Sequence, residues 1–232
     1  MNLSTATVFI TGANRGLGLA LAREALAQGA RKVYVAARNP AGIDLPGVVP
    51  IRLDVTSEAD IATLAEQAPD VNLLINNAGV AEFGGFLSDT SVAAARRQME
   101  VNFFGPLRVT QALAPVLAAN GGGAVLNVLS VASWINRPLL GTYGATKSAA
   151  WALTNGLRHE LREQGTRVSG LHVGFIDTDL TQGIDAPKLD AAQVARETLQ
   201  AVAEGREEIL VGDLTRQVKA GLNAEPPVYI AA

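Results

Sequence analysis

The stretch Thr11-Gly-Ala-Asn-Arg-Gly-Leu-Gly18 separates an apolar run at residues 6–10 from a helix-forming stretch at residues 19–28. A strand, a glycine-rich turn and a helix in this order bring main-chain N–H groups to the positive end of the helix, where they can bind a diphosphate. The glycine spacing, G-x-x-x-G-x-G, differs by one residue from the G-x-G-x-x-G pattern of longer dinucleotide-binding domains. The stretch predicts a phosphate site, and the alternative is a turn that only packs the helix on the strand.

Length and composition indicate one α/β domain with a single core, because the chain has 232 residues of which 48% are hydrophobic. The absence of cysteine excludes disulfides, a thiolate zinc site and a cysteine nucleophile. The 19 basic residues are scattered and the net charge is −3, which argues against nucleic-acid or anionic-membrane partners. No apolar stretch reaches the ~18 residues that span a bilayer, and the first residues lack a positive leader region. We therefore expect a cytoplasmic protein with a small-molecule partner, no metal site and no membrane association.

Strands and helices are predicted to alternate along the chain. After the strand at residues 6–10, apolar runs predict strands at residues 33–37, 48–53, 71–75, 124–129, 167–173 and 208–211, and helical patterns predict helices at residues 19–28, 60–67, 91–119, 143–164 and 191–203. This alternation requires right-handed crossovers and gives a doubly wound parallel sheet of about seven strands, which binds ligands at its carboxyl edge. The candidate site residues fall at that edge.

The second predicted strand ends in a basic residue where NAD-binding domains usually carry an acid. Ala37 is followed by Arg38 and Asn39, and Arg15 lies inside the glycine-rich turn. A guanidinium at these positions can form charge-assisted bonds with a 2′-phosphate, whereas NAD presents only a ribose hydroxyl there. The two arginines together favour NADP(H), although each alone would also be an ordinary surface charge.

Two further strand ends carry polar residues. Asp54 and Val55 follow the third predicted strand, where a carboxylate can accept from an adenine amino group or cap the following loop. The fourth predicted strand ends in Asn76-Asn77-Ala78-Gly79, in which the amides can fix a tight turn and the glycine lets the backbone approach a ribose. Both strand ends predict the adenosine side of a nucleotide pocket.

A candidate acid–base pair stands at the start of the predicted helix 143–164. Tyr143 and Lys147 are four residues apart and therefore share one helical face. A free phenol has a pKa of ~10 and is a poor proton donor at neutral pH, whereas a nearby ammonium lowers that pKa. Ser130 closes a strand thirteen residues before Tyr143, where its hydroxyl can hold a substrate carbonyl beside the phenol. Ser133 competes for this role but has a different spacing.

Three motifs together resemble the short-chain dehydrogenase/reductase family: T-G-x-x-x-G-x-G at residues 11–18, N-N-A-G at residues 76–79, and the serine followed by Tyr-x-x-x-Lys. The resemblance covers about residues 5–180, and the last fifty residues match only loosely. It implies a Rossmann-type, doubly wound three-layer αβα sandwich in which residues 1–232 form one dinucleotide-binding and catalytic domain. With the two arginines, it implies NADP(H) as the coenzyme.

The resemblance also implies roles for individual residues. Asn102, inside the predicted helix 91–119, would help to place a water that relays protons to the lysine, and an asparagine there can also stabilise a helix kink. Residues 173–178 resemble a P-G-x-I-x-T segment, with Val173 in place of the proline, and this segment would contact the nicotinamide and the phosphates. The implied coenzyme-binding residues are Gly12, Asn14, Arg15, Gly16, Leu17, Gly18, Arg38, Asp54, Val55, Asn77, Ala78, Gly79, Tyr143, Lys147, Ile176 and Thr178, and the implied catalytic residues are Asn102, Ser130, Tyr143 and Lys147.

The expected function is that of an NADPH-dependent carbonyl reductase or the matching alcohol dehydrogenase. Ser130 would orient the carbonyl, Tyr143 would exchange the proton, and Lys147 would tune the phenol and hold the nicotinamide ribose. A 3-ketoacyl-acyl-carrier-protein reductase is the alternative within the family. A nucleotide-sensing protein of this fold would be expected to lack the tyrosine or the lysine, and a cofactor-free lyase or dehalogenase to replace the lysine; neither change occurs. The chain has no G-x-S-x-G and no Gly-Lys-Ser/Thr loop, and His159 and His172 stand in no metal or nucleophile motif.

A lipophilic substrate and a homo-oligomer complete these expectations. The residues expected to face the substrate are mostly apolar: Val80, Phe83, Phe86, Val131, Trp134, Ile135, Leu139 and Leu140. Arg137 is the one nearby cation, which could meet a carboxylate or a phosphopantetheine or remain a solvated loop residue. The helices at 91–119 and 143–164 resemble the pair that forms an intersubunit four-helix bundle in the family. Small residues there would permit close approach: Ala94, Ala95, Ala149, Ala150 and Ala152.

Overall fold

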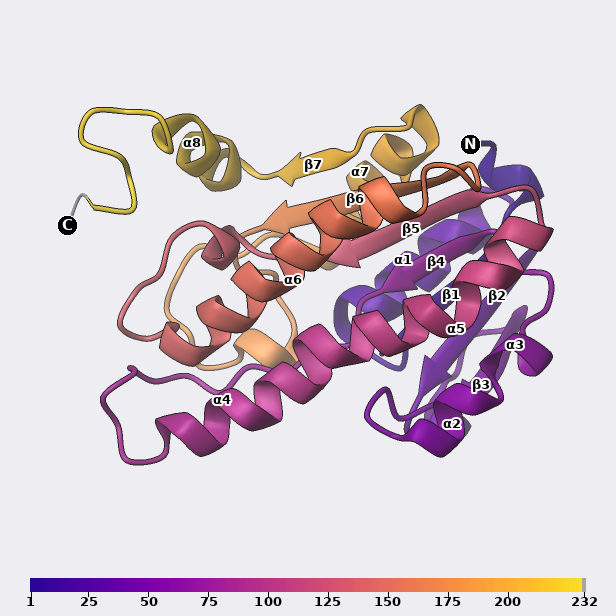
Figure 1. Ribbon diagram of the computed structural model, residues 1–232, viewed down its shortest axis with the longest axis horizontal. Helices are drawn as coiled ribbons and strands as arrows, with labels where there is room; N and C mark the ends of the chain where they lie inside the picture. The colour runs from indigo at the N-terminus through magenta and orange to yellow at the C-terminus, as the bar shows by residue number, and fades with distance from the viewer. Residues whose placement is uncertain (231–232) are drawn as a thin grey trace.

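The computed structural model describes residues 1–230, in which seven parallel strands form one sheet (Figure 1). The strands are β1 (Thr7–Thr11), β2 (Lys32–Ala37), β3 (Val48–Arg52), β4 (Leu73–Asn76), β5 (Gly123–Val128), β6 (Thr166–Val173) and β7 (Glu208–Val211). Their spatial order is β3-β2-β1-β4-β5-β6-β7, which reverses between β1 and β4. Ligands bind doubly wound sheets beyond the carboxyl ends of the strands at this reversal. The predicted doubly wound sheet of seven strands is confirmed.

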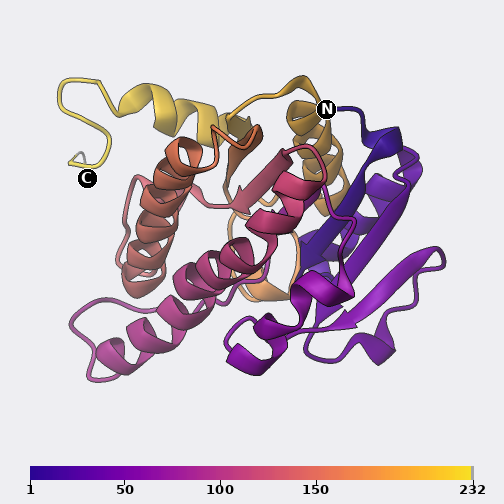
Figure 2. The ribbon, with the colours of Figure 1, turned by 45° about the vertical axis from the view of Figure 1, so that its right-hand side comes forward.

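Helices cover both faces of this sheet (Figures 1 and 2). They are α1 (Gly16–Ala27), α2 (Glu58–Ala62), α3 (Leu64–Gln67), α4 (Ser91–Met99), α5 (Gly105–Ala119), α6 (Gly141–Glu160), α7 (Ala191–Glu204) and α8 (Asp213–Gly221). Helices α1 and α7 pack together on one face, and α5 and α6 lie on the other. No helix within residues 1–230 is long and apolar enough to cross a membrane.

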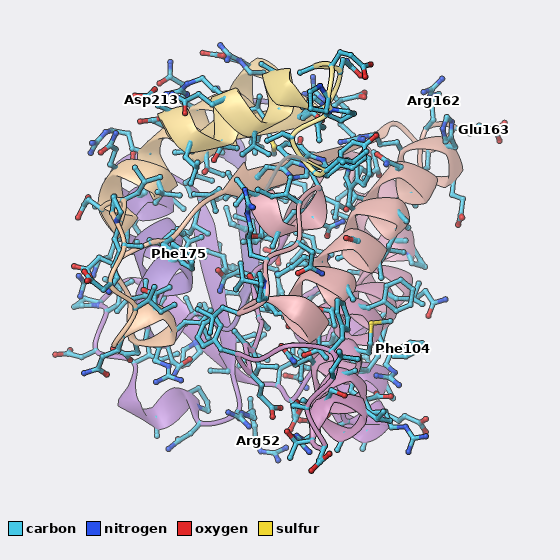
Figure 3. The ribbon with its side chains drawn as sticks, turned by 90° about the vertical axis from the view of Figure 1, so that its left-hand side faces the viewer. Arg52, Phe104, Arg162, Glu163, Phe175 and Asp213 are labelled. Atoms are coloured by element: carbon cyan, nitrogen blue, oxygen red, sulfur yellow. The ribbon has the colours of Figure 1, made fainter. Side chains whose placement is uncertain are left out.

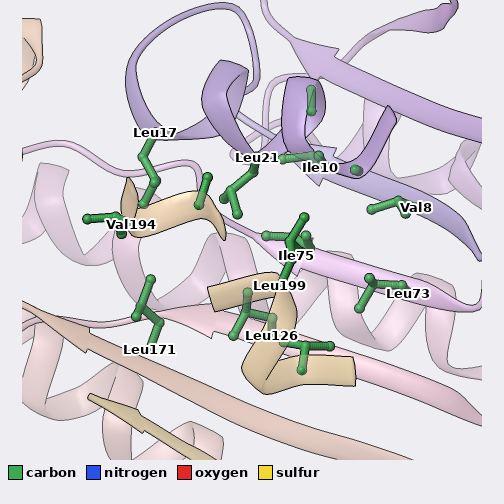
Figure 4. Close-up of a cluster of buried hydrophobic side chains, with 14 of the residues drawn as sticks. Val8, Ile10, Leu17, Leu21, Leu73, Ile75, Leu126, Leu171, Val194 and Leu199 are labelled. Atoms are coloured by element: carbon green, nitrogen blue, oxygen red, sulfur yellow. The ribbon is translucent and has the colours of Figure 1, made fainter. Parts of the chain in front are cut away.

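Strand β1 contributes to both halves of the core because all of its side chains are buried and successive ones point to opposite faces. Val8 and Ile10 join Leu21 of α1 and Leu199 of α7 in one cluster (Figure 4). Phe9 joins the cluster beneath α5 and α6 on the other face. Strands buried on both faces are typical of parallel sheets and read as continuous apolar runs. The core therefore fixes the carboxyl end of β1, from which the glycine-rich turn begins.

The long helix predicted at residues 91–119 contains an irregularity. Helices α4 and α5 are joined by a π-helical turn, Glu100–Phe104, with the buried Asn102 at its centre. A π turn widens the helix locally and is frequent at functional sites. The widened turn places the side chain of Asn102 beside the loop after β4, at the carboxyl edge of the sheet.

Several element boundaries differ from the predictions. The helix predicted at residues 60–67 is instead two short helices, α2 and α3, which meet at Thr63, where the threonine hydroxyl donates to the carbonyl of Asp60. Helix α1 begins at Gly16 rather than residue 19, and α6 spans 141–160 rather than 143–164. Helix α8 was not predicted; it follows Gly212, whose φ of +87° breaks the extended chain after β7.

Two of the alanines expected at a subunit interface are used inside the chain. Ala94 and Ala150 are buried, since α4 packs against α6, whereas Ala152 is exposed. Close approach by another subunit therefore cannot use Ala94 or Ala150. The exposed apolar side chains of this region are instead those of Val92 and Phe104.

Candidate active site

A cavity of about 620 Å³ lies at the carboxyl edge of the sheet. Figure 3 views the molecule from this edge, with Asp213 at the start of α8 above Phe175, which lines the cavity. The lining residues from Gly12 to Gly79 are called the coenzyme half here, and those from Val80 to Val228 the catalytic half. Every residue of the expected coenzyme set lines the cavity, as does Ser130. Asn102 of the expected catalytic set lies behind the cavity wall.

The glycine-rich turn is held by the residues that follow β4. The Asn77 side-chain amide donates to the carbonyl oxygens of Thr11, at 2.9 Å, and Gly12, at 3.1 Å. In return, the Thr11 hydroxyl accepts from the main-chain N–H groups of Asn77 and Ala78, both at 3.0 Å. Asn76 points elsewhere and donates to Asn127 at 2.8 Å inside the sheet. The N-N-A-G motif therefore braces the sheet with its first amide and the turn with its second.

The turn has the shape that a dinucleotide requires. Gly12 and Gly16 have φ values of +64° and +55°, which side chains rarely permit. A Cβ on Gly18 would lie 2.4 Å from the carbonyl oxygen of Gly12, so only glycine lets α1 start this close to the turn. Helix α1 has neither a side-chain cap nor an acidic residue in its first turn. Its free N–H groups and positive end therefore fit a diphosphate.

Arg15 and Arg38 are exposed residues on the rim of the coenzyme half. Nη1 of Arg15 lies 3.1 Å from Oδ2 of Asp179, which joins the turn to the segment after β6. Both side chains of this pair are about two-thirds exposed (68% and 64%). An ion pair this exposed contributes only ~0–1 kcal/mol, so Arg15 can exchange Asp179 for a phosphate at little cost. Arg38 follows β2 directly, as predicted.

Asp54 and Val55 line the coenzyme half, where the third strand ends. Oδ1 of Asp54 accepts from the main-chain N–H of Thr56 at 2.9 Å and from its hydroxyl at 2.8 Å. The carboxylate therefore caps its own loop, which is one of the two interpretations left open by the sequence. Asp54 also lines the cavity, so the second interpretation, a contact with an adenine, stays a prediction.

Ser130 follows β5 and begins a short 3-10 turn, Val131–Ser133. Its hydroxyl oxygen accepts from the N–H of Ala132 at 3.1 Å, and its own N–H donates to the hydroxyl of Ser133 at 3.3 Å. This reciprocal cap fixes the Ser130 hydroxyl at the cavity wall. Ser133 is buried and does not line the cavity, so its hydroxyl serves as the cap.

Tyr143 lines the cavity from the first turn of α6 and lies half-buried. Burial raises the pKa of Tyr143 to about 12, and a hydrogen bond with the Ser130 hydroxyl opposes this rise only in part. The sequence predicted a lowered pKa for Tyr143, and this was wrong in direction. Removing the phenolate from water costs more free energy than the neighbouring groups supply by stabilising it. At neutral pH the group is therefore a phenol, which can give a proton.

Lys147 lies one turn further along α6 and is buried. Its ammonium donates to the carbonyl oxygen of Val128 at 2.8 Å and lies 5.8 Å from the centre of the Tyr143 ring. Burial lowers the pKa of Lys147 to about 8. Tyr143 and Lys147 are thus both shifted toward their neutral forms by burial.

Asn102 joins the loop after β4 to α6. Its side-chain oxygen accepts from the N–H of Val80, and its side-chain nitrogen donates to the carbonyl of Val80, both at 2.9 Å. The same nitrogen donates to the Thr146 hydroxyl at 2.9 Å, which in turn donates to the carbonyl of Tyr143 at 2.8 Å. Asn102 therefore braces both the cavity wall and the helix that carries the phenol. A proton relay through it stays a prediction.

The catalytic half has a largely apolar lining. Five of the residues expected to face a substrate line it: Val80, Phe83, Val131, Ile135 and Leu140. Phe86 and Leu139 point to solvent, and Trp134 turns away from the cavity and stacks on His172. Arg137, which is exposed, is also part of the lining.

Part of this apolar wall was not predicted. Leu214 and Val218 of α8, and Val228 beyond it, line the cavity together with Phe175 and Leu180. No motif marks the residues after 211, and the only available signal was the spacing of Leu214 and Val218, which places two apolar residues on one helical face. The segment therefore belongs to the site although the sequence resemblance does not extend to it.

Comparison with known proteins agrees with this geometry. Residues 6–189 match the family model for short chain dehydrogenases. The chain belongs to the short-chain dehydrogenase family. Members of this family are NAD(P)-dependent oxidoreductases, and the resemblance inferred from the sequence motifs is confirmed.

Three relatives illustrate the range within the family. Mouse "Dehydrogenase/reductase SDR family member 7B" is 31% identical over 247 residues, covering 91% of this chain and 74% of the mouse protein. A short chain dehydrogenase from Burkholderia cenocepacia, solved in complex with NADP, is 36% identical with a TM-score of 0.93, covering 97% of this chain and 96% of that one. A 3-ketoacyl-(acyl-carrier-protein) reductase from Brucella melitensis, complexed with NADH, is 26% identical with a TM-score of 0.78, covering 86% and 91%. Relatives of this short-chain dehydrogenase thus bind either coenzyme.

Proposed function

We propose that this short-chain dehydrogenase is an NADPH-dependent carbonyl reductase, which also catalyses the reverse oxidation of the alcohol. The observation that carries the proposal is that Ser130, Tyr143 and Lys147 line the same cavity, with the ammonium of Lys147 5.8 Å from the centre of the Tyr143 ring. All three residues belong to the catalytic half, whose lining is largely apolar. NADPH, when bound, supplies the hydride for the carbonyl carbon. Residues of the protein bind and orient the substrate and transfer the proton.

Ser130 and Tyr143 act on the carbonyl oxygen of the substrate. The Ser130 hydroxyl donates a hydrogen bond that orients this oxygen, because its position is fixed by Ala132 and Ser133. Tyr143 then gives its phenolic proton to the oxygen as negative charge develops there. The raised pKa of Tyr143, about 12, keeps the proton on the phenol until the substrate is in place.

Lys147 stabilises the phenolate that forms when Tyr143 gives up its proton. An ammonium near the ring favours the negatively charged form of the phenol. Its pKa of about 8 keeps Lys147 charged at neutral pH despite burial. The carbonyl of Val128 fixes the ammonium in place.

The preference for NADP(H) is proposed from the rim of the coenzyme half. Arg38 and Arg15 are both available to a 2′-phosphate, and the rim strand ends in a base rather than the acid typical of NAD-binding domains. The Burkholderia cenocepacia relative, with its NADP complex, supports this assignment.

The apolar lining of the catalytic half favours a lipophilic ketone or aldehyde as the substrate. Arg137 on the rim supports a second candidate, a 3-ketoacyl-acyl-carrier-protein reductase, since a guanidinium suits the phosphate of a phosphopantetheine. A nucleotide-sensing protein of this fold would not need the Ser130, Tyr143 and Lys147 arrangement. The oxidoreductase assignment is therefore preferred over a binding protein.

The test is NADPH consumption by the purified protein with aliphatic and aromatic ketones, β-ketoesters and acyl thioesters as separate panels. We expect lipophilic ketones to be reduced with the highest kcat/KM. Preference for the thioesters would support the second candidate. Tight NADPH binding without turnover on any panel would instead support the nucleotide sensor.

We also propose that the enzyme is a homo-oligomer. Val92 and Phe104 are exposed on the α4–α5 path, and burial of such side chains would favour association through this face. Light scattering at micromolar concentration should give a mass at least twice the 24.1 kDa of one chain. A mass equal to one chain would contradict this.

A further inference from the structure

His172 is a fully buried imidazole that the proposed reaction does not use. It lies near the end of β6, and its side chain has no solvent exposure. The ring stacks on Trp134 with centroids 3.7 Å apart and planes inclined by 17°, and Trp151 contacts it edge-on at 6.5 Å. The ring is thereby held rigidly behind the turn that carries Ser130.

The imidazole contacts the main chain of Ser130. Nδ1 of His172 lies 3.2 Å from the carbonyl oxygen of Ser130. A carbonyl oxygen only accepts, so the proton of the neutral ring must be on Nδ1 for this contact to be favourable. Burial lowers the pKa of His172 to about 4, although the hydrogen bond with Ser130 and the charge of Glu208 oppose the shift, while Lys219 and Arg158 add to it. The ring is therefore neutral at working pH, with Nδ1–H donating to Ser130.

The same turn holds the reactive hydroxyl. The carbonyl oxygen of Ser130 also accepts from the N–H of Ser133 at 3.0 Å, and the Ser130 hydroxyl is fixed by the N–H of Ala132. With the contact from His172, the carbonyl oxygen has two donors, as many as its lone pairs. Rotation of the peptide that carries Ser130 would break these bonds together, so the contact with His172 limits the positions open to the hydroxyl.

We propose that His172 is a positioning residue for the reaction, which holds the Ser130 hydroxyl at the substrate carbonyl by donating from Nδ1 to the Ser130 main chain. The proposal rests on the proposed carbonyl reduction. It adds to that function a residue outside the cavity lining, one that acts through Ser130 and touches neither substrate nor coenzyme.

The second ring nitrogen of His172, Nε2, argues that the residue does more than fill space in the core. Nε2 of His172 is buried and has no hydrogen-bond partner within residues 1–230. An unpaired buried acceptor destabilises the folded protein, whereas a phenylalanine could stack on Trp134 without that cost. Packing alone would thus be better served by an apolar ring. The donor on Nδ1 is what a phenylalanine cannot supply.

Two substitutions separate the donor from the ring. His172→Phe keeps an aromatic ring and removes the donor, and His172→Asn keeps a donor near the Nδ1 position and removes the ring. We expect His172→Phe to lower kcat about fivefold to tenfold with unchanged NADPH affinity and an equal or higher Tm, because small displacements of a reacting group are costly. We expect His172→Asn to keep kcat within about twofold of wild type while its Tm falls. His159→Phe, on the exposed face of α6, is the matched control and should change neither.

The outcomes distinguish this inference from the proposed function. A wild-type enzyme that reduces no carbonyl would overturn the proposed function and this role with it. An active wild type whose His172→Phe variant keeps full kcat, or whose His172→Asn variant loses kcat as His172→Phe does, would overturn this role alone. Nitrogen-15 NMR of the wild-type imidazole gives a readout independent of turnover. It should show the proton on Nδ1 between pH 6 and 9 (roughly, given the lowered pKa), and a proton on Nε2 would contradict the proposal.

Discussion

The two halves of the cavity are built in different ways. The coenzyme half consists of a glycine-rich turn, an uncapped helix end and exposed arginines on its rim. The catalytic half depends on ionisable groups of α6 that are removed from water, which raises the pKa of Tyr143 and lowers that of Lys147. In the proposed function, the first half recognises the coenzyme through the main chain and solvent-screened charge. The second half performs the chemistry with buried groups, whose electrostatic interactions are stronger than in water.

This difference predicts that substitutions in the catalytic half act on kcat and on pH dependence, whereas those on the rim of the coenzyme half act on coenzyme choice. It also predicts that the catalytic effects are larger, because a buried group has no solvent to replace it.

Tyr143→Phe should cause the largest loss. It removes the proton donor and keeps the ring, so we expect kcat to fall by ~10²–10⁴-fold while NADPH affinity is unchanged. Steady-state kinetics with a ketone substrate and a fluorescence titration with NADPH measure the two quantities. Tyr229→Phe, on an exposed tyrosine outside the cavity lining, is the control. Turnover within threefold of wild type would show that Tyr143 is not the acid.

Lys147→Met should act through the ionisation of the phenol and lower kcat by about 10²-fold. In the wild type, kcat/KM for reduction should decline as the pH rises through about 8, where Lys147 loses its charge and no longer stabilises the phenolate. In the variant this decline should move to higher pH. A decline that stays near pH 8 would assign it to another group.

The same substitution should stabilise the folded protein without coenzyme at pH 7. The folded-state pKa of Lys147, about 8, lies below its usual 10.5, so the unfolded chain binds more protons between these values and stability rises with pH there. Below pH 8 the buried ammonium is a cost that methionine does not have. We expect a Tm higher by a few degrees (~2–4 °C) in a thermal melt, and an unchanged Tm would indicate that the ammonium is better solvated than its burial implies.

Arg38→Asp should change coenzyme choice and not chemistry. The lost guanidinium and the new carboxylate should lower kcat/KM for NADPH by ~10–100-fold and leave that for NADH equal or higher. Arg23→Asp makes the same charge change on an exposed residue of α1 outside the cavity and controls for net charge. Retention of NADPH preference by the Arg38→Asp enzyme would make Arg38 a surface charge.

Arg15→Ala should have the smallest effect, a loss of less than about tenfold in kcat/KM for NADPH, because Arg15 already has a partner in Asp179. Asp179→Asn frees the guanidinium and should raise NADPH affinity slightly. An equal response of NADH and NADPH to both substitutions would show that Arg15 does not contact the 2′-phosphate.

The sequence predicted the coenzyme half more completely than the catalytic half. The order of strands and helices and the glycine-rich turn follow from local patterns, because glycine spacing and strand ends act on their immediate neighbours. Ser130, Tyr143 and Lys147 could be named, but the direction of the Tyr143 pKa could not. Burial depends on segments distant in the sequence, and no residue pattern records it.

Two features of the molecule could not be predicted from the sequence motifs. Helix α8 and Val228 complete the apolar wall from a region where the resemblance to the family is weak. The role proposed for His172 depends on the 3.2 Å contact between its Nδ1 and the carbonyl oxygen of Ser130, forty-two residues earlier in the chain. Long-range contacts of this kind are decided by how the sheet and helices pack.

The transfer of deuterium from the coenzyme to the product tests most directly whether NADPH reduces a carbonyl with Tyr143 as the acid. The wild-type enzyme is incubated in ordinary water with NADPH deuterated at both C4 positions and the best ketone of the substrate panel. We expect an alcohol that carries one deuteron on the carbinol carbon and a solvent-derived proton on the oxygen, with little product formed by Tyr143→Phe under the same conditions. An alcohol without deuterium on that carbon, or equal product from the variant, would contradict reduction by NADPH with Tyr143 as the acid.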